Sequence, residues 1–344
     1  MGLFFRSIVV PVVVIGIAIL IALCFFQSKL IFVPQLDSGD RSPYSNPNGW
    51  RHPGEKGIPY EDIQLDTEAN VTVHMWLMKQ KDSRNVPTLI FYHGNAGNLG
   101  HRLPNLEQLY KRSKLNVLAC SYRGYGLSTG IPSELGFFHD AGRVVEYLRT
   151  RDDIDSNRLY VFGRSLGGAV AIETARRNPE HIRGLIIENT FWDMRSMAVL
   201  LFRPLVAFGN LLNLLLQHKF MSGQAIMQVK QPILFLSGDE DTIVPPSQML
   251  DLYKTARQSK FRHFVSIAGG SHNECWLLYP TKYYESIDDF IRAVEGNEGE
   301  DMNIVLGTKK KSPTEITKKA PEDQGNFFSR IIGLFTNEYN SKEL

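Results

Sequence analysis

Short apolar runs alternate along the chain with longer segments in which apolar residues recur three or four positions apart. A short apolar run bounded by turn residues is typical of a buried strand, and the wider spacing is typical of a helix. Eight runs predict strands, at residues 63–65, 71–78, 87–92, 116–122, 159–162, 184–187, 233–236 and 264–267. Helices are predicted at 101–113 and at 133–150, the second capped by Ser133. This alternation predicts an α/β protein with a mostly parallel, eight-stranded sheet and helices on both faces.

One strand, turn and helix carry a chemical signature. Residues 158–172 read as an apolar run, then Gly163-Arg-Ser-Leu-Gly167, then a helix of small residues. A turn this sharp needs a strained backbone at Ser165, and side chains at Gly163 and Gly167 would collide with the strand and the helix. The pattern is the nucleophile elbow of the α/β-hydrolase fold, with Ser165 as nucleophile. An ordinary strand-to-helix turn, or a hydrolase fold without its chemistry, remains the alternative.

A serine nucleophile needs a base and an orienting acid, which follow it in the chain order Ser, Asp or Glu, His. The acid candidates lie directly after the predicted strand 233–236: Asp239, Glu240 and Asp241. The pattern Gly-x-x-Asp-x-x-Val-Pro of related hydrolases favours Asp241. His272 follows the last predicted strand, in a loop of Gly and Ser residues, and is the predicted base. The other histidines are predicted to be surface or packing residues.

A tetrahedral intermediate needs two backbone N–H donors. One is predicted at Leu166, directly after the nucleophile. The other is predicted in the loop after His93, at Asn95, with Ala96 as the alternative. The three cysteines have neither zinc nor disulfide spacing, so no metal or other cofactor is predicted.

The N-terminus carries the longest apolar run. Residues 7–28 contain no charged residue, and roughly 20 residues at 1.5 Å each cross a hydrocarbon layer of about 30 Å. We predict an uncleaved transmembrane signal anchor at 7–28, because the run ends in a poor cleavage site. The very short N-terminal arm favours a single-pass, type II protein of an endomembrane or the cell surface. The sequon at Asn70 is a candidate glycosylation site compatible with that topology.

The remaining segments complete the domain organisation. Residues 29–59 are predicted to be a connector, and 60–295 the hydrolase domain. Within it, the apolar insertion 192–229 is predicted to form a small cap, which either offers an apolar face to an acyl chain or bilayer or packs on the core. The polar tail 296–344 is predicted to be disordered, with a short amphipathic helix at 326–336 as one alternative.

Five motifs stand in order along the chain. They are His93-Gly-Asn-Ala-Gly-Asn-Leu-Gly-His-Arg-Leu-Pro104, Tyr122-Arg-Gly-Tyr-Gly-Leu-Ser128, Gly163-Arg-Ser-Leu-Gly-Gly168, Glu188-Asn-Thr-Phe191 and Asp241-Thr-Ile-Val-Pro-Pro246. Together they resemble the Bem-type membrane serine hydrolases, from roughly the anchor to Glu295. The resemblance implies Ser165, Asp241 and His272 as the triad of a single-pass membrane protein. It does not supply a substrate.

These features together predict a membrane-anchored serine hydrolase that cleaves esters or thioesters through an acyl-enzyme. The anchor favours substrates near the bilayer, either acyl lipids or S-acylated proteins. The net charge of +2 gives no reason to expect a nucleic-acid partner, and the oligomeric state is left open. A serine peptidase of the prolyl-oligopeptidase type and a non-catalytic membrane scaffold are the alternatives.

Overall fold

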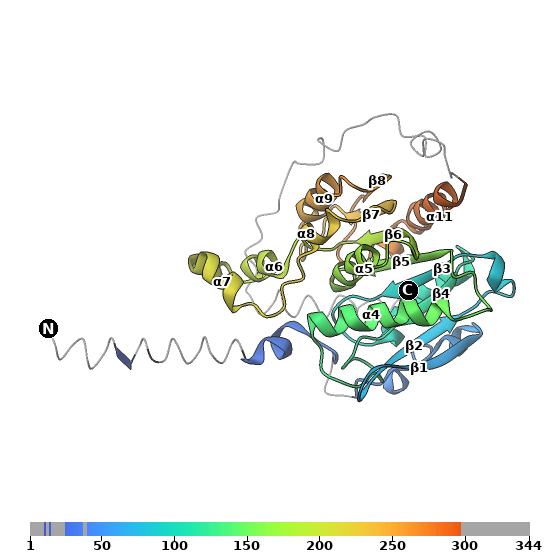
Figure 1. Ribbon diagram of the computed structural model, residues 1–344, viewed down its shortest axis with the longest axis horizontal. Coiled ribbons are helices and arrows are strands. Elements are labelled where there is room, and N and C mark those ends of the chain that lie inside the picture. Colours follow the sequence, from blue (N-terminus) through green and yellow to red (C-terminus); the bar gives the residue numbers. More distant parts are fainter. Residues whose placement is uncertain (1–9, 12–13, 15–24, 37–39, 297–344) are drawn as a thin grey trace.

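A computed structural model of the protein describes residues 10–11, 14, 25–36 and 40–296 (Figure 1). Its centre is an eight-stranded sheet in the order β1-β2-β4-β3-β5-β6-β7-β8. The strands are β1 (Tyr60–Glu68), β2 (Val71–Met78), β3 (Thr88–Tyr92), β4 (Asn116–Cys120), β5 (Leu159–Arg164), β6 (Ile182–Glu188), β7 (Ile233–Gly238) and β8 (Arg262–Ile267). All neighbours are parallel except the pairs β1–β2 and β2–β4. The predicted α/β-hydrolase sheet is confirmed.

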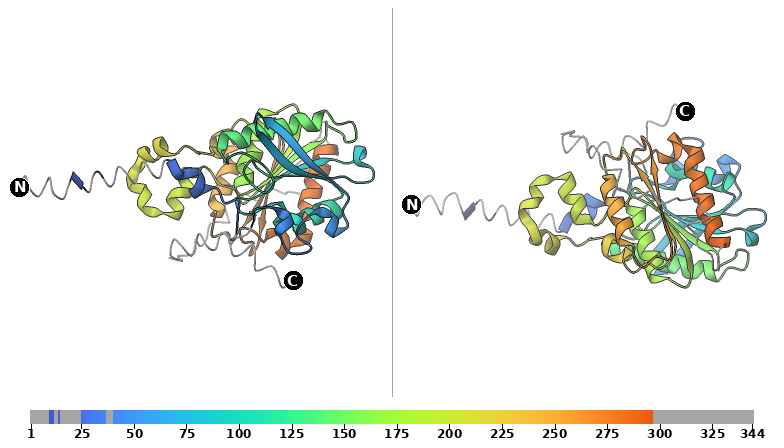
Figure 2. Two further views of the ribbon diagram at one scale, coloured as in Figure 1. Left: turned by 90° about the horizontal axis from the view of Figure 1, so that it is seen from below. Right: turned by 90° about the horizontal axis from the view of Figure 1, so that it is seen from above.

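Helices cover both faces of this sheet, as Figure 2 shows. On one face lie α4 (Glu134–Arg149), α5 (Leu166–Arg177), α8 (Ser222–Ile226) and α9 (Pro246–Thr255); on the other lie α3 (Leu103–Lys111), α10 (Cys275–Leu278) and α11 (Pro280–Gly296). Successive side chains of a strand point to opposite faces of the sheet, so each strand contributes to an apolar core on both faces. Val161 of β5 packs on the first face and Phe162 on the second.

The helix bounds follow their capping residues. The Ser133 side chain accepts a hydrogen bond from the Gly136 N–H at 3.2 Å, so α4 begins where the sequence predicts. The helix predicted at 101–113 is shorter, because a 3-10 turn at Leu99–Arg102 precedes α3. Pro104 lies in the first turn of α3, where its missing N–H costs no hydrogen bond.

The first strand is longer than its apolar pattern indicates. Residues 63–65 were predicted, but β1 spans Tyr60–Glu68 and pairs with β2 as an antiparallel edge hairpin. Its residues alternate between exposed and partly covered positions, so most of its polar side chains face solvent. An apolar run therefore identifies only the middle of such an edge strand.

The insertion between β6 and β7 forms short helices, which are α6 (Met194–Leu201), the 3-10 helix η6 (Arg203–Phe208), α7 (Gly209–Leu215) and α8. Its part around α7 lies beside the helical residues 25–31 (Figures 1 and 2). Most of the predicted span 7–28, and the tail beyond residue 296, lie outside the described residues. Within the described part of the chain, no helix has the length and apolar character needed to cross a bilayer.

Candidate active site

Ser165 lies in the sharp turn between β5 and α5, with φ 54° and ψ −118°. A Cβ atom on Gly163 would lie 2.1 Å from the Gly167 carbonyl oxygen, and one on Gly167 would lie 2.1 Å from the Tyr92 carbonyl oxygen. Strand, turn and helix are therefore too close for any side chain at these two positions. The turn leaves Ser165 partly exposed at the carboxyl end of a central strand.

The strained turn is held by the neighbouring strand β6. The Ser165 N–H donates to the Glu188 carbonyl at 3.0 Å. The Thr190 hydroxyl donates to the Ser165 carbonyl at 2.7 Å. Backbone strain of this kind persists only where surrounding contacts enforce it. These two hydrogen bonds hold the Ser165 backbone at its N–H and at its carbonyl.

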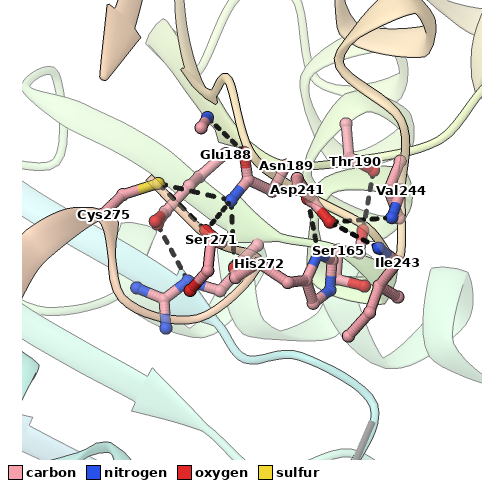
Figure 3. A network of polar contacts seen from close by, with 12 residues as sticks. Ser165, Glu188, Asn189, Thr190, Asp241, Ile243, Val244, Ser271, His272 and Cys275 are labelled. Atoms are coloured by element: carbon pink, nitrogen blue, oxygen red, sulfur yellow. Dashed lines mark hydrogen bonds and ion pairs between the residues drawn. The ribbon is translucent and has the colours of Figure 1, made fainter. Parts of the chain in front are cut away.

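His272 and Asp241 lie together on the adjoining loops. The Nδ1–H of His272 donates to Oδ2 of Asp241 at 2.7 Å, and both side chains are buried. The other oxygen, Oδ1, accepts the N–H groups of Ile243 and Val244, each at 2.9 Å. The carboxylate is thus fixed by two backbone donors and turned toward the imidazole, and Figure 3 shows this pair beside Ser165.

The other two acid candidates are arranged differently. Asp239 and Glu240 are exposed. The Asp239 carboxylate accepts the Gly269 N–H at 2.6 Å and so closes the turn between the β7 and β8 loops. Of the three carboxylates, only Asp241 is bonded to His272 in the described structure.

Asn189, which the sequence did not single out, joins these loops. Its Oδ1 accepts the Gly238 N–H at 2.8 Å, and its Nδ2 donates to the carbonyls of Ser271 at 3.1 Å and His272 at 3.0 Å (Figure 3). Asn189 is 1% exposed and has φ 45°, a conformation that asparagine tolerates better than most residues. The side chain therefore fixes the His272 loop against the ends of β6 and β7.

A buried ion pair lies under the serine turn. The Arg164 Nε–H donates to Glu188 at 2.9 Å, and the Tyr283 hydroxyl donates to the same carboxylate oxygen at 2.7 Å. Burial alone would lower the pKa of Arg164, but the adjacent Glu188 charge raises it above its usual value. Both residues belong to motifs that carry the family resemblance, and their pairing across two strands was not predicted.

The two predicted oxyanion donors come from different segments: Leu166 directly follows the serine, and Asn95 follows Gly94, where an added Cβ would lie 3.9 Å from the Ser165 Cβ. Leu166 is the first residue of α5, so its N–H has no acceptor within the helix. Asn95 lies in the loop after β3, where its Nδ2 donates to the Ile31 carbonyl at 2.6 Å and its Oδ1 accepts the Tyr125 hydroxyl at 2.7 Å. Nearby, the Gly97 N–H donates to the Val33 carbonyl at 3.0 Å. The loop is therefore held by the segment that follows the predicted membrane span.

His93, at the start of that loop, is fully buried and donates through Nδ1–H to the Gly94 carbonyl at 2.6 Å. Burial lowers the pKa of His93 to about 3, so the ring is neutral at physiological pH. The Asn70 sequon lies far from these residues in the sequence, in the exposed turn between β1 and β2. The described residues contain no group of three or more His, Cys, Asp or Glu side chains suited to a metal ion.

The sheet order and the strained strand-to-helix turn define an α/β-hydrolase fold. The esterase Pf2001 of Pyrococcus furiosus has this fold, with a TM-score of 0.60 over 76% of this chain and 97% of that one, at 17% identity. The model of the prolyl oligopeptidase family matches residues 136–291.

The relatives narrow the class to one family. Protein bem46 of Schizosaccharomyces pombe is 37% identical over 277 residues, which cover 79% of this chain and 89% of that protein. The uncharacterized membrane protein YNL320W of Saccharomyces cerevisiae is 34% identical over 269 residues, covering 77% and 89%. The chain therefore belongs to the Bem46-type family of α/β-hydrolase domain proteins, and the predicted resemblance is confirmed.

Proposed function

We propose that the protein is a membrane-anchored serine hydrolase that cleaves ester or thioester bonds of acyl substrates. The observation that carries the proposal is the 2.7 Å bond between His272 and Asp241 on loops beside a strained, partly exposed Ser165. A neutral imidazole with Nδ1–H bound to a carboxylate presents Nε2 as a base. That is the tautomer needed to accept a proton from a serine hydroxyl.

The reaction then follows from the roles of these groups. Ser165 Oγ attacks the acyl carbon while His272 Nε2 takes its proton, and Asp241 stabilises the resulting imidazolium. The N–H groups of Leu166 and Asn95 bind the oxyanion. His272 returns the proton to the leaving alcohol or thiol, which departs and leaves an acyl-Ser165 ester. Water, deprotonated by His272, hydrolyses this ester and regenerates the free serine.

The membrane location rests on sequence and on one relative. The apolar run at 7–28 has the length of a transmembrane helix, and YNL320W is named a membrane protein. A single-pass, type II anchor in an endomembrane or the cell surface would keep the site close to lipid. Acyl lipids and S-acylated proteins are therefore the proposed substrate classes.

A serine peptidase is the second candidate, because the prolyl oligopeptidase model matches residues 136–291. The matched region contains the nucleophile, acid and base positions, which peptidases and esterases of this fold share. The described insertion at 192–229 is a small cap of short helices. A peptidase of the prolyl-oligopeptidase type would need a large gating domain to select peptides by size. A small cap therefore favours small acyl substrates over peptides.

Labelling with a fluorophosphonate probe in membranes tests the chemistry. We expect the wild type to be labelled, and Ser165→Ala and His272→Ala to lose labelling, while the control Ser286→Ala is labelled like the wild type. Ser286 donates to a backbone carbonyl on the surface of α11, so its loss leaves the site intact. Absence of labelling in folded wild type would refute the hydrolase proposal and favour the scaffold.

Substrate preference is tested with the same variants. Esters and thioesters of graded acyl length, and proline-containing peptide amides, are compared by kcat/KM. Faster turnover of acyl esters or thioesters supports the proposal. Faster cleavage of the peptide amides assigns the protein to the peptidases.

A further inference from the structure

Large apolar side chains are exposed on two neighbouring segments at the N-terminal side of the molecule. One is the short helix 25–31, and the other is the part of the cap formed by η6 and α7 (Figures 1 and 2). Their most exposed apolar residues are Phe25, Phe26, Leu30, Val206, Leu211 and Leu214, with Phe25 and Leu214 each 80% exposed. We call residues 25–30 together with 202–214 the apolar face. Contiguous apolar surface of this kind marks an interaction site.

The two segments form one unit because hydrogen bonds join them at the base of the cap. The Gln27 side chain donates to the Leu215 carbonyl at 2.6 Å and accepts the Gln217 N–H at 2.9 Å. Ser28 Oγ and His218 Nε2 are hydrogen-bonded at 2.8 Å. Helix 25–31 therefore lies in a fixed position against the cap rather than as a free extension.

Charge indicates what covers this face. Residues 194–221 and 25–36 contain no Asp or Glu. They do contain exposed cations, Lys29, Arg203 and Lys219. The Glu134 carboxylate lies at the base of the cap, where it accepts the N–H groups of Lys219 and Phe220. Two apolar segments that carry cations and no carboxylate of their own fit the interface of a bilayer with anionic lipids, where apolar side chains enter the acyl region and cations meet phosphate.

The direction of the chain supports the same occupant. The apolar run 8–26 ends in Phe25 and Phe26, which belong to the face, so the sequence that leads into the face is itself suited to lipid. We infer that the apolar face lies in the interfacial layer of an anionic bilayer, where η6 and α7 make a second membrane contact beside the end of the N-terminal span at residue 28. This inference rests on the membrane anchor of the proposed function but adds a contact made by the folded domain.

The second contact has a consequence for the candidate site. Helix 25–31 ends at Ile31, and the carbonyls of Ile31 and Val33 accept hydrogen bonds from the Asn95 side chain and the Gly97 N–H. The predicted oxyanion loop is thus bonded to the residues that directly follow the first segment of the apolar face. A domain seated on the bilayer in this way would hold the predicted oxyanion loop against residues close in the chain to its membrane contact.

The test measures lipid contact at a single position of the full chain. In a Cys24→Ser background, one cysteine is introduced at Leu214→Cys or, as control, at Asp152→Cys, and is labelled with an environment-sensitive nitrobenzoxadiazole dye. Native Cys120 and Cys275 are buried and react poorly. Asp152 is exposed in the loop before β5, at the amino edge of the sheet. Each protein is reconstituted in phosphatidylcholine vesicles with and without phosphatidylserine.

We expect the dye at residue 214 to show blue-shifted emission and several-fold stronger quenching by doxyl-labelled lipids than the dye at residue 152. Arg203→Glu should reduce this quenching in phosphatidylserine vesicles. Water-like emission at 214, in protein that floats with the vesicles, would overturn the inference while leaving the anchor intact. A blue shift without doxyl quenching would also overturn it, because a protein would then cover the face. Fluorophosphonate labelling reports separately on the proposed chemistry.

Discussion

Removal of the Asn189 side chain should lower kcat strongly while the free energy of unfolding falls only moderately. Asn189 bonds the end of β7 through Gly238 and the His272 loop through two carbonyls, at distances of 2.8–3.1 Å. Asn189→Gly deletes these three bonds together with the weaker contact from Nδ2 to Cys275 Sγ at 3.4 Å, and glycine accepts the φ of 45° without strain. The variant thus isolates the contribution of the side chain.

The magnitude follows from the three bonds. Each buried hydrogen bond contributes about 1 kcal/mol net, so the free energy of unfolding should fall by about 3 kcal/mol. For a domain of this size, that corresponds to a decrease of about 6–12 °C in melting temperature. A displacement of His272 by about 1 Å should lower kcat about 100-fold. KM should change little, because Asn189 is buried behind the loop.

The assay combines thermal unfolding in detergent with kcat and KM for a chromogenic acyl ester. The matched control is Asn178→Gly, which removes one side-chain bond to the Thr174 carbonyl at the end of α5. The control should lose about 1 kcal/mol and keep the wild-type kcat. A kcat of Asn189→Gly within twofold of wild type, despite the lower melting temperature, would refute the positioning role.

Three further predictions concern the residues around the serine turn. Glu188→Leu leaves Arg164 buried without its partner and should cost about 3–5 kcal/mol in thermal unfolding; the double variant with Arg164→Met should recover most of it. Failure of the second change to restore stability would show that the pair is not coupled. Gly163→Ala places a Cβ 2.1 Å from the Gly167 carbonyl oxygen, so it should abolish soluble folded protein, and folded variant in size-exclusion chromatography would contradict this. Because His93 has a pKa of about 3 when folded, the unfolded state alone binds its proton below about pH 6.5. The contribution of His93 to the free energy of unfolding should therefore be lost as pH falls, by about 2 kcal/mol at pH 5. The melting temperature of His93→Gln should accordingly fall less steeply with decreasing pH than that of the wild type.

The sequence predicts features whose cause is local. The turn at Ser165 needs Gly163 and Gly167 within two positions of it, so the strand, turn and helix can be recognised together. The central strands are buried on both faces and appear as apolar runs, whereas the edge strand β1 alternates and was only partly predicted. The acid lay among three neighbouring carboxylates, of which the Gly-x-x-Asp-x-x-Val-Pro pattern favoured Asp241, and in the fold Asp241 is the one bonded to His272.

Contacts between distant segments could not be predicted in this way. Arg164 and Glu188 are 24 positions apart, and Asn189 reaches a loop more than 80 positions away. The bond between Asn95 and Ile31 spans 64 positions. Each is made by a polar side chain whose neighbours in the sequence give no periodic signal. Their partners become evident only when the strand order brings the loops together.

Residues 188–190 show why the site is assembled at this edge of the sheet. Glu188 pairs with Arg164 beneath the turn, Asn189 holds the His272 loop, and Thr190 donates to the Ser165 carbonyl. Three consecutive side chains at the end of one strand therefore fix the elements on both sides of it. Because a shift of β6 would move Ser165 and His272 together, their separation is buffered against small motions of the sheet. Relative motion of the two backbones is opposed by the bonds that Asn189 makes to the His272 carbonyl and Thr190 makes to the Ser165 carbonyl, so these two side chains help to fix the geometry on which the proposed proton transfer depends.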